Sequence, residues 1–165
     1  VAGHAPRRRP RVSGPTGATG VGSSQLHGLS RLAAVLAASA ALRELHVTWG
    51  WVVVVLNGVA GVAALAAHRY RVLRHRALWW LVGAAHGSVF VQVVLGVILI
   101  QGRDTAPVRM HMFYGFVAAF SVGIIYSYRA QLKPKLYLLY GAGSLFLMGL
   151  ALRSIYLDPA AVGRR

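Results

Sequence analysis

The sequence contains no cysteine, so disulfide bonds and thiolate metal sites are excluded. Acidic residues are almost as rare, since three of them stand against 18 lysines and arginines. The three carboxylates, Glu44, Asp104 and Asp158, all lie outside the long apolar runs, which argues against a carboxylate relay across a membrane. A Gly-rich phosphate loop, an HExxH motif and a serine-nucleophile motif are also missing. The sequence therefore offers no catalytic residues and gives no support to a hydrolase.

Apolar residues, in contrast, are abundant and gathered in long runs. They make up 56% of the 165 residues, and the mean hydropathy is +0.56. The run 77–101 has His86 and Gln92 as its only strongly polar side chains. At about 1.5 Å per residue, a helix of that length crosses a hydrocarbon core of roughly 30 Å. The sequence predicts an all-α integral membrane protein, an up-down-up-down four-helix bundle with spans at about 47–67, 77–101, 109–130 and 136–157.

Short segments flank this transmembrane domain, which we expect to cover residues 46–158. Residues 1–30 are rich in Gly, Pro, Arg and Ser, and this composition predicts a disordered basic tail. Residues 31–45 hold an apolar stretch about half the length of a span, which predicts a short amphipathic helix at the membrane interface. The alternative is a signal-like segment, because Ala38–Ser39–Ala40 resembles a small-residue cleavage site. Residues 159–165 form a C-terminal tail.

The cations predict how the chain is oriented. The turns 68–76 and 128–135 carry seven lysines and arginines between them, whereas the turn 102–108 and its flank carry Arg103 and Arg109. Under the positive-inside rule the two basic turns face the cytoplasm, which predicts a multi-pass protein of the cytoplasmic membrane. Cations next to apolar runs favour anionic lipid headgroups as partners and do not indicate nucleic acid.

One polar side chain from each predicted span falls at a similar depth. Counted from the cytoplasmic boundary, Asn57, His86, Ser121 and Ser144 all lie roughly 12 to 15 Å into the membrane. A polar layer at mid-membrane is either a set of interhelical hydrogen bonds or a functional site. In the second case the layer is a candidate path for a small transporter or channel.

A second polar group is expected at the opposite, outer face. It is a charged cluster of Arg103, Asp104, Arg109 and Arg153, in which Arg153 pairs with Asp104 or Asp158. His46 and His111 share this boundary and are candidates for a pair. An ion pair is the structural interpretation of the charges, and quinone or anion binding is the functional one.

Small residues predict where the helices approach one another. Gly83 and Gly87 stand in GxxxG spacing, and Gly50, Asn57 and Gly61 share one narrow face of the first span. Because lipid provides no hydrophobic drive between helices, close backbone contact has to hold them together. These faces are candidates for helix packing within the chain or with another subunit.

The runs HMFYGFVAAFSVGIIYSYR and LYLLYGAGSLFLMGL resemble small uncharacterised four-span membrane proteins of high-GC bacteria, over residues 46–157. The four spans with His86 and His111 also bear a likeness to the cytochrome b561 and haem A synthase families. That likeness implies haem b held between transmembrane histidines, with His86, His111 and His46 as candidate contacts for haem or quinone. His86 and His111 are expected about 15 Å apart in depth, which does not suit two ligands of one haem. Met148 is nearer to His86 in depth and is an alternative ligand, and His46 with His111 is a candidate pair at the outer boundary.

The leading functional interpretation is a non-enzymatic accessory or assembly subunit of a membrane complex, associating with other subunits or with itself. It requires no metal and no cofactor. The first alternative is a haem- or quinone-linked electron-transfer component, and the second is a small transporter or channel.

Overall fold

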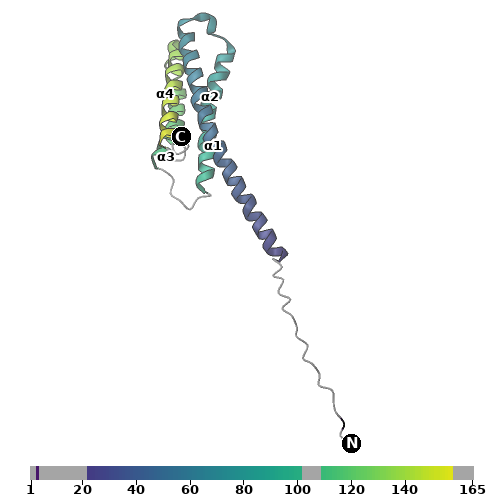
Figure 1. The fold of residues 1–165 in the computed structure, drawn as a ribbon. Helices are drawn as coiled ribbons and strands as arrows, with labels where there is room; N and C mark the ends of the chain where they lie inside the picture. Colours follow the sequence, from purple (N-terminus) through teal and green to yellow (C-terminus); the bar gives the residue numbers. More distant parts are fainter. Residues whose placement is uncertain (1–2, 4–21, 102–108, 158–165) are drawn as a thin grey trace. The chain divides into compact units, whose positions relative to one another are not determined.

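The computed structural model describes Gly3 and residues 22–101 and 109–157. Within these residues every regular element is helical (Figure 1). The elements are α1 (Ser23–Arg69), η1 (Arg71–Leu73), α2 (Arg76–Gln101), α3 (Arg109–Ser127), η2 (Lys133–Lys135) and α4 (Leu136–Tyr156). The chain divides into two compact units, residues 1–35 and residues 36–165. In the first unit the described part of α1 exposes Leu26, Leu29 and Leu32. The second contains all of the packed helices and is called the four-helix unit below.

The described helices have the character of membrane-spanning segments. Four of them are long and apolar enough to cross a membrane, namely Gln25–Arg69, Arg76–Gln101, Arg109–Ser127 and Lys133–Tyr156. Large apolar side chains point outward, with Phe120 and Trp80 exposing 76% and 75% of their surface, whereas His86 and Asn57 expose 1% and 0%. Exposed apolar area of this extent is unfavourable in water and favourable in lipid. The class that these features suggest is a multi-pass membrane protein.

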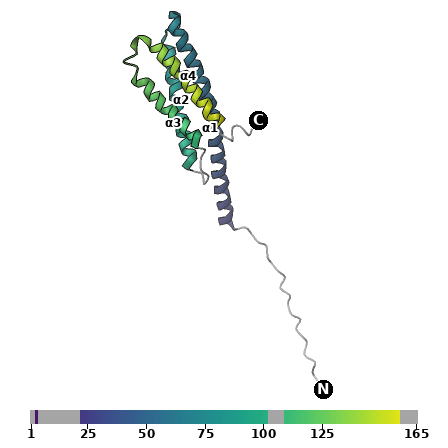
Figure 2. The ribbon, with the colours of Figure 1, turned by 90° about the vertical axis from the view of Figure 1, so that its left-hand side faces the viewer.

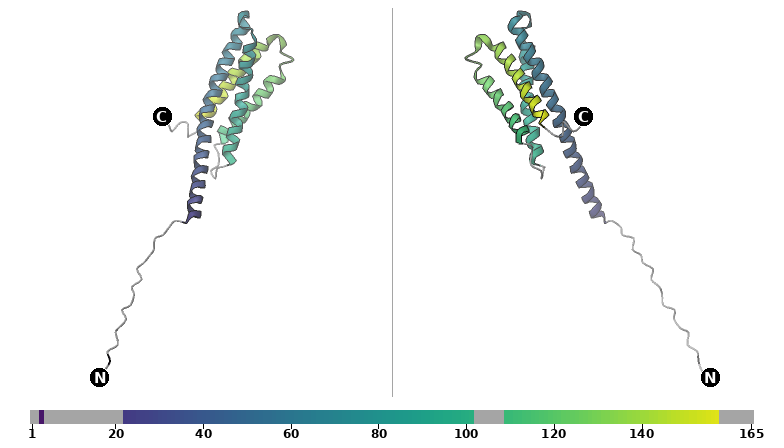
Figure 3. Two further views of the ribbon diagram at one scale, coloured as in Figure 1. Left: turned by 90° about the vertical axis from the view of Figure 1, so that its right-hand side faces the viewer. Right: turned by 60° about the vertical axis from the view of Figure 1, so that its left-hand side comes forward.

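The turns place consecutive helices side by side. The α1–α2 turn and the α3–α4 turn lie at the same end of the four-helix unit (Figures 1 and 2). The end of α2 and the start of α3 lie toward the opposite end, as two further views show (Figure 3). We call the first the basic end, because both of its turns are rich in Arg and Lys, and the second the histidine end, after His46 and His111.

Arg74 stabilises the first turn. Its Nε donates to the carbonyl oxygen of Ala67 at 2.8 Å, and its Nη2 donates to that of His68 at 2.9 Å. The last carbonyls of a helix have no partner within it, and a cation near them also complements the helix dipole. The guanidinium carbon of Arg74 lies 5.0 Å from the ring centre of Tyr137, so the same side chain contacts α4.

Several core positions hold small residues, which lets the helices come close together. Ala60, Ala64, Ala67 and Ala85 are all buried, and Leu147 of α4 is fully buried beside them. Small side chains let backbones approach, and packing then replaces the hydrophobic effect as the main attraction in lipid. The indole Nε1 of Trp49 adds a hydrogen bond from α1 to the carbonyl oxygen of Ser88 in α2 at 3.1 Å.

The largest differences from the predicted boundaries are at the start of α1 and the end of α3. α1 continues from Ser23 to Arg69, so the predicted short helix 31–45 and the predicted first span belong to one helix. Arg43 and Glu44 do not end it, because both are good helix formers. α3 ends at Ser127, three residues before the predicted end of its span. The predicted disordered tail up to residue 21, the bend 102–108 and the tail 159–165 lie outside the described residues.

Candidate functional site

The mid-depth polar layer is held together by specific hydrogen bonds between helices. His86 Nε2 lies 3.0 Å from the hydroxyl oxygen of Ser144, which joins α2 to α4. The Asn57 side chain donates from Nδ2 to the carbonyl oxygens of Val53 at 2.9 Å and Ala85 at 3.0 Å, and the second bond joins α1 to α2. Three of the four predicted residues therefore connect helices.

Ser121 does not take part in these connections. Its hydroxyl donates to the carbonyl oxygen of Val117, one turn earlier in α3, at 2.7 Å. Instead, α3 reaches His86 through Tyr126, whose ring centre lies 5.6 Å from the imidazole centre. Tyr140 of α4 completes the surroundings, with ring centres 6.0 Å from His86 and 5.5 Å from Tyr126. The layer is thus an aromatic cage around one histidine rather than a ring of four polar groups.

Sequence reasoning missed this cage. Tyr126 and Tyr140 stand near the predicted cytoplasmic ends of their spans, where aromatic residues are usual as interfacial anchors. Helical side chains lean toward the N-terminus of their own helix, so depth counted along the backbone misplaces large rings. Tyr126 is in the last turn of α3 and Tyr140 is near the first turn of α4. Both rings nevertheless contact the imidazole of His86.

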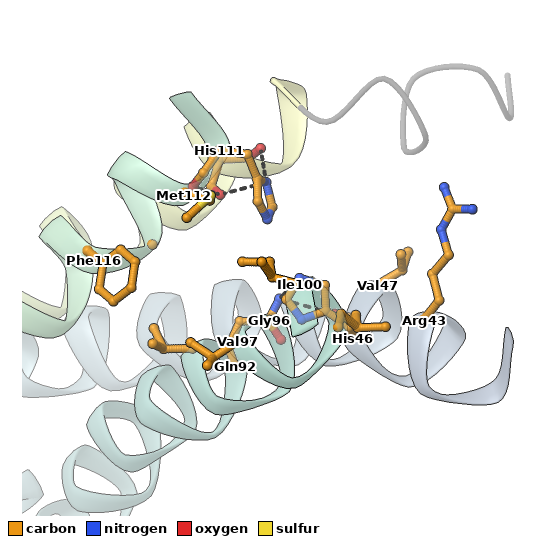
Figure 4. Close-up of a pocket in the computed structure, with 14 residues that line it drawn as sticks. Arg43, His46, Val47, Gln92, Gly96, Val97, Ile100, His111, Met112 and Phe116 are labelled. Carbon is orange, nitrogen blue, oxygen red and sulfur yellow. Dashed lines mark hydrogen bonds between the residues drawn. The ribbon is translucent and has the colours of Figure 1, made fainter. Parts of the chain in front are cut away.

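At the histidine end, His46 and His111 lie together beside a cavity of about 130 Å³ (Figure 4). Their ring centres are 5.9 Å apart, although 65 residues separate them in sequence, and the ring planes meet at 63°. α1, α2, α3 and α4 all contribute to the wall. We call this site the histidine cavity; it is lined by Arg43, His46, Val47, Gln92, Val93, Gly96, Val97, Leu99, Ile100, His111, Met112, Gly115, Phe116 and Ser154.

Each imidazole of this pair is fixed by a neighbour on another helix. His111 Nδ1 lies 3.0 Å from both the carbonyl oxygen and the hydroxyl oxygen of Ser154 in α4. The side-chain amide nitrogen of Gln92 in α2 donates to the backbone carbonyl of His46 at 3.1 Å and lies 3.4 Å from His46 Nε2. A Cβ on Gly96 would come within 3.1 Å of the His46 ring, so a glycine makes room for that imidazole. The pair is therefore held by packing and hydrogen bonds.

The predicted histidines separate into two places. His86 is buried in the mid-depth cage and does not line the histidine cavity, so it is not the partner of His111. His46 and His111, which were candidates for a pair because they share the predicted outer boundary, lie next to each other in the fold. Gln92 was visible in the sequence as a polar residue within a span, but it was not assigned to a site. Ser154 gave no signal in the sequence.

The predicted charged cluster is described only in part. Arg103 and Asp104 lie outside the described residues, and so does Asp158. Arg109 and Arg153 are exposed and belong to the same helices as His111 and Ser154, α3 and α4. Among the described residues no three His, Cys, Asp or Glu side chains gather as a metal-binding group.

The glycines fall into two groups. Gly50 and Gly61 of α1 face other helices of the same chain, since a Cβ on Gly61 would come within 2.7 Å of the Leu145 side chain. The stripe of Gly50, Asn57 and Gly61 is therefore used within the chain and is not open to a partner. Gly83 and Gly87 of α2 are exposed, and a Cβ at either position would meet nothing within 4 Å among the described residues.

In comparisons with known proteins, no family model matches this chain, and neither a curated protein nor a solved structure matches it.

Proposed function

We propose that this chain is an electron-transfer component of the cytoplasmic membrane that holds a small redox ligand, haem or quinone, in the histidine cavity. In this proposal the four helices form an up-down-up-down bundle across the bilayer. The basic end faces the cytoplasm, because its two turns carry seven lysines and arginines. The histidine cavity then lies near the outer boundary of the membrane.

The observation that carries the proposal is the meeting of His46 and His111 from α1 and α3 at one cavity. Ligand sites in proteins are mostly apolar hollows with a few polar groups that fix orientation. The wall has this character, with Val93, Val97 and Phe116 beside the two imidazoles. Histidines inside or at the edge of a membrane are energetically costly, so their presence there indicates a functional site. Both of these histidines line the same cavity.

Both ligand types match the chemistry of the wall. Imidazole nitrogens are common axial ligands of haem iron. The carbonyl oxygens of a quinone accept hydrogen bonds, and the wall supplies the guanidinium of Arg43 as a donor. The ring of either ligand is apolar and suits the aliphatic part of the wall.

A thermal-shift experiment tests the proposal. A ligand that binds only the folded protein stabilises it, by about 2.7 kcal/mol at a concentration 100 times its Kd. Purified protein in mild detergent is heated with added hemin or with a short-chain quinone, and at least one of them is expected to raise the Tm. The variant Gly115→Leu fills the cavity and should lose the shift. Gly123→Leu, on the same helix and away from the cavity, should keep it. A Tm that neither compound changes would refute the proposal.

A second candidate function is an accessory or assembly subunit, and the free face of α2 favours it. Gly83 and Gly87 are open, and Trp80, Phe90 and Val94 beside them are exposed. Small residues between large apolar ones suit the close approach of another transmembrane helix. Capture from solubilised membranes tests it. The wild type and Gly149→Leu should recover the same membrane protein in equimolar amount, and the double substitution Gly83→Leu/Gly87→Leu should lose it. Equal recovery of the membrane protein with the wild type and both variants would contradict the accessory-subunit function.

A further inference from the structure

A groove lies between α3 and α4 at the basic end, beside the turn that joins these two helices (Figure 2). It is formed by residues 121–125 of α3 and residues 132–146 of the turn and α4, and its volume is about 400 Å³. We call it the α3–α4 groove. It shares no lining residue with the histidine cavity, so the two are separate sites.

The α3–α4 groove is closed at its floor and open toward the outside of the four-helix unit. Ile125 is buried at the floor, where α3 and α4 touch, since a Cβ on Gly143 would come within 2.6 Å of its side chain. Leu138 and Phe146 line the groove and are 41% and 55% exposed. Apolar hollows are not filled by water. In the proposed bundle the groove therefore takes up either a lipid chain or an apolar segment of another protein.

The interior of the groove offers no free polar group to a ligand. Among its described lining residues, Ser121 is the uncharged polar one, and its hydroxyl already donates to the carbonyl oxygen of Val117. The charged one is Lys135, immediately before the first residue of α4. A ligand that fits this groove is apolar along its length and carries its charge at the basic end.

The length of the groove matches one leaflet of a bilayer. On α4 it runs from Lys135 to Phe146, which are 11 residues apart. At about 1.5 Å per residue this is roughly 16 Å, about half of a hydrocarbon core of roughly 30 Å. A transmembrane helix of a partner would need a groove along the whole bundle. A single acyl chain of the leaflet at the basic end fits the observed length.

The charge at the mouth of the groove favours an anionic headgroup. The basic turns 68–76 and 128–135 carry seven lysines and arginines and no acidic residue. Within the described part of the chain the only carboxylate is that of Glu44, which follows Arg43 of the histidine cavity. Lysine stems lie along apolar surface while the ammonium group reaches the headgroups, and clustered cations attract anionic lipids.

We infer that the α3–α4 groove binds one anionic phospholipid from the leaflet at the basic end. One acyl chain lies in the groove, and the phosphate group pairs with the ammonium group of Lys135. Lys133, two residues earlier, adds a second cation to the same turn. A lipid bound in this way contacts both α3 and α4 and stabilises their packing. The site is independent of the redox ligand proposed for the histidine cavity.

Thermal unfolding of the full-length protein tests the headgroup preference, because a ligand that binds only the folded state raises the Tm. Lipid-depleted protein in mild detergent is titrated with phosphatidylglycerol and with phosphatidylcholine of the same acyl chains. We expect the anionic lipid to act at the lower concentration. Lys135→Gln should weaken its apparent affinity about fivefold, which is the effect of one cation near a lipid surface. Arg109→Gln removes an exposed cation at the histidine end and should leave the affinity unchanged.

Native mass spectrometry of the same samples tests the groove itself. We expect one retained phosphatidylglycerol per wild-type chain. Ala142→Leu places a larger side chain in the groove and should lose this lipid. Gly149→Leu, on the same helix with open space around it, should keep the lipid. Circular dichroism confirms that each variant is folded.

Three results would overturn the inference. Equal affinities for the two lipids would show that the anionic headgroup is not recognised. Phosphatidylglycerol retained by Ala142→Leu would show that the acyl chain lies elsewhere. A wild-type dimer that Ala142→Leu dissociates would show that a second copy of this chain fills the groove. The proposed function is tested separately, by hemin and quinone at the histidine cavity, and stands or falls independently of these results.

Discussion

At the scale of single residues, the interior of the four-helix unit depends on a few exact hydrogen-bonding roles. Asn57 is fully buried and uses its amide nitrogen twice, on the carbonyl oxygens of Val53 and Ala85. Its amide oxygen has no hydrogen-bond partner among the described residues. The position therefore requires a donor or an apolar group and excludes an acceptor, because only carbonyl oxygens face that end of the side chain.

Substitution of Asn57 tests this role. Asn57→Leu removes two hydrogen bonds and one unsatisfied oxygen, and we expect it to lower the free energy of unfolding by about 1 kcal/mol. Asn57→Asp places an acceptor against two carbonyls and buries a charge, so we expect a loss of about 3 kcal/mol or more. Chemical unfolding in detergent, followed by circular dichroism, measures both. Equal stability of the two variants would show that the amide makes no such bonds.

The bond between His86 and Ser144 is a separate prediction. A double-mutant cycle with His86→Phe and Ser144→Ala should give a coupling free energy of about 0.6 kcal/mol, the average for interhelical hydrogen bonds in membranes. The value is small because the unfolded chain in lipid also finds partners for these groups. Unfolding of the four proteins in the same detergent supplies the cycle. Strictly additive losses would mean that the 3.0 Å contact carries no interaction energy.

At the scale of helices, glycines mark where two backbones meet and where a face is free. Gly141 of α4 packs on α1, since a Cβ there would come within 2.7 Å of the Leu65 side chain and 3.0 Å of its backbone nitrogen. Gly61 makes the reciprocal contact from α1 toward Gly141 and Leu145. The GxxxG pair Gly83 and Gly87 looks equivalent in sequence, yet it makes no such contact within the described residues.

Alanine substitutions should separate the two groups. Gly61→Ala and Gly141→Ala overpack the α1–α4 contact and are expected to lower the free energy of unfolding by about 1 to 3 kcal/mol. Gly83→Ala and Gly87→Ala enter open space, and the better helix propensity of alanine should leave stability unchanged or raise it by up to about 1 kcal/mol. Thermal unfolding of the purified variants compares them. A loss at Gly83 as large as that at Gly61 would contradict the observed packing.

At the scale of the whole molecule, the hydropathy of the sequence predicts the helices well. It predicts less well which side chains within those helices bond to one another. The runs 77–101 and 136–157 match α2 and α4 to within one residue, because the length of an apolar run is set by the bilayer. Depth also made His46 and His111 candidates for a pair. Depth could not show that the Ser121 hydroxyl donates to a backbone carbonyl of its own helix. Serine side chains in helices can form this bond with the carbonyl one turn earlier. Nor does depth show that α1 continues past Arg43 and Glu44, because polar residues end a span without ending a helix.

The proposed orientation is testable in the whole protein, and the lack of cysteine provides a clean background. Arg71→Cys and Lys133→Cys place single thiols in the two basic turns, and Met110→Cys places one at the start of α3. A membrane-impermeant maleimide added to intact cells should label only Met110→Cys, and labelling of the other two should require opened cells. Labelling of Arg71→Cys in intact cells would reverse the orientation and place the histidine cavity on the cytoplasmic side.

The cofactor content of three purified proteins tests the central claim most directly, which is that the histidine cavity holds the redox ligand. The wild type, His46→Ala/His111→Ala and His86→Ala are produced with ample haem, and each is analysed by its dithionite-reduced visible spectrum and by solvent extraction for quinone. The account predicts haem or quinone in the wild type and in His86→Ala, and neither in the double variant. If the ligand is lost from His86→Ala and kept in the double variant, the site lies in the aromatic cage around His86, and the account is contradicted.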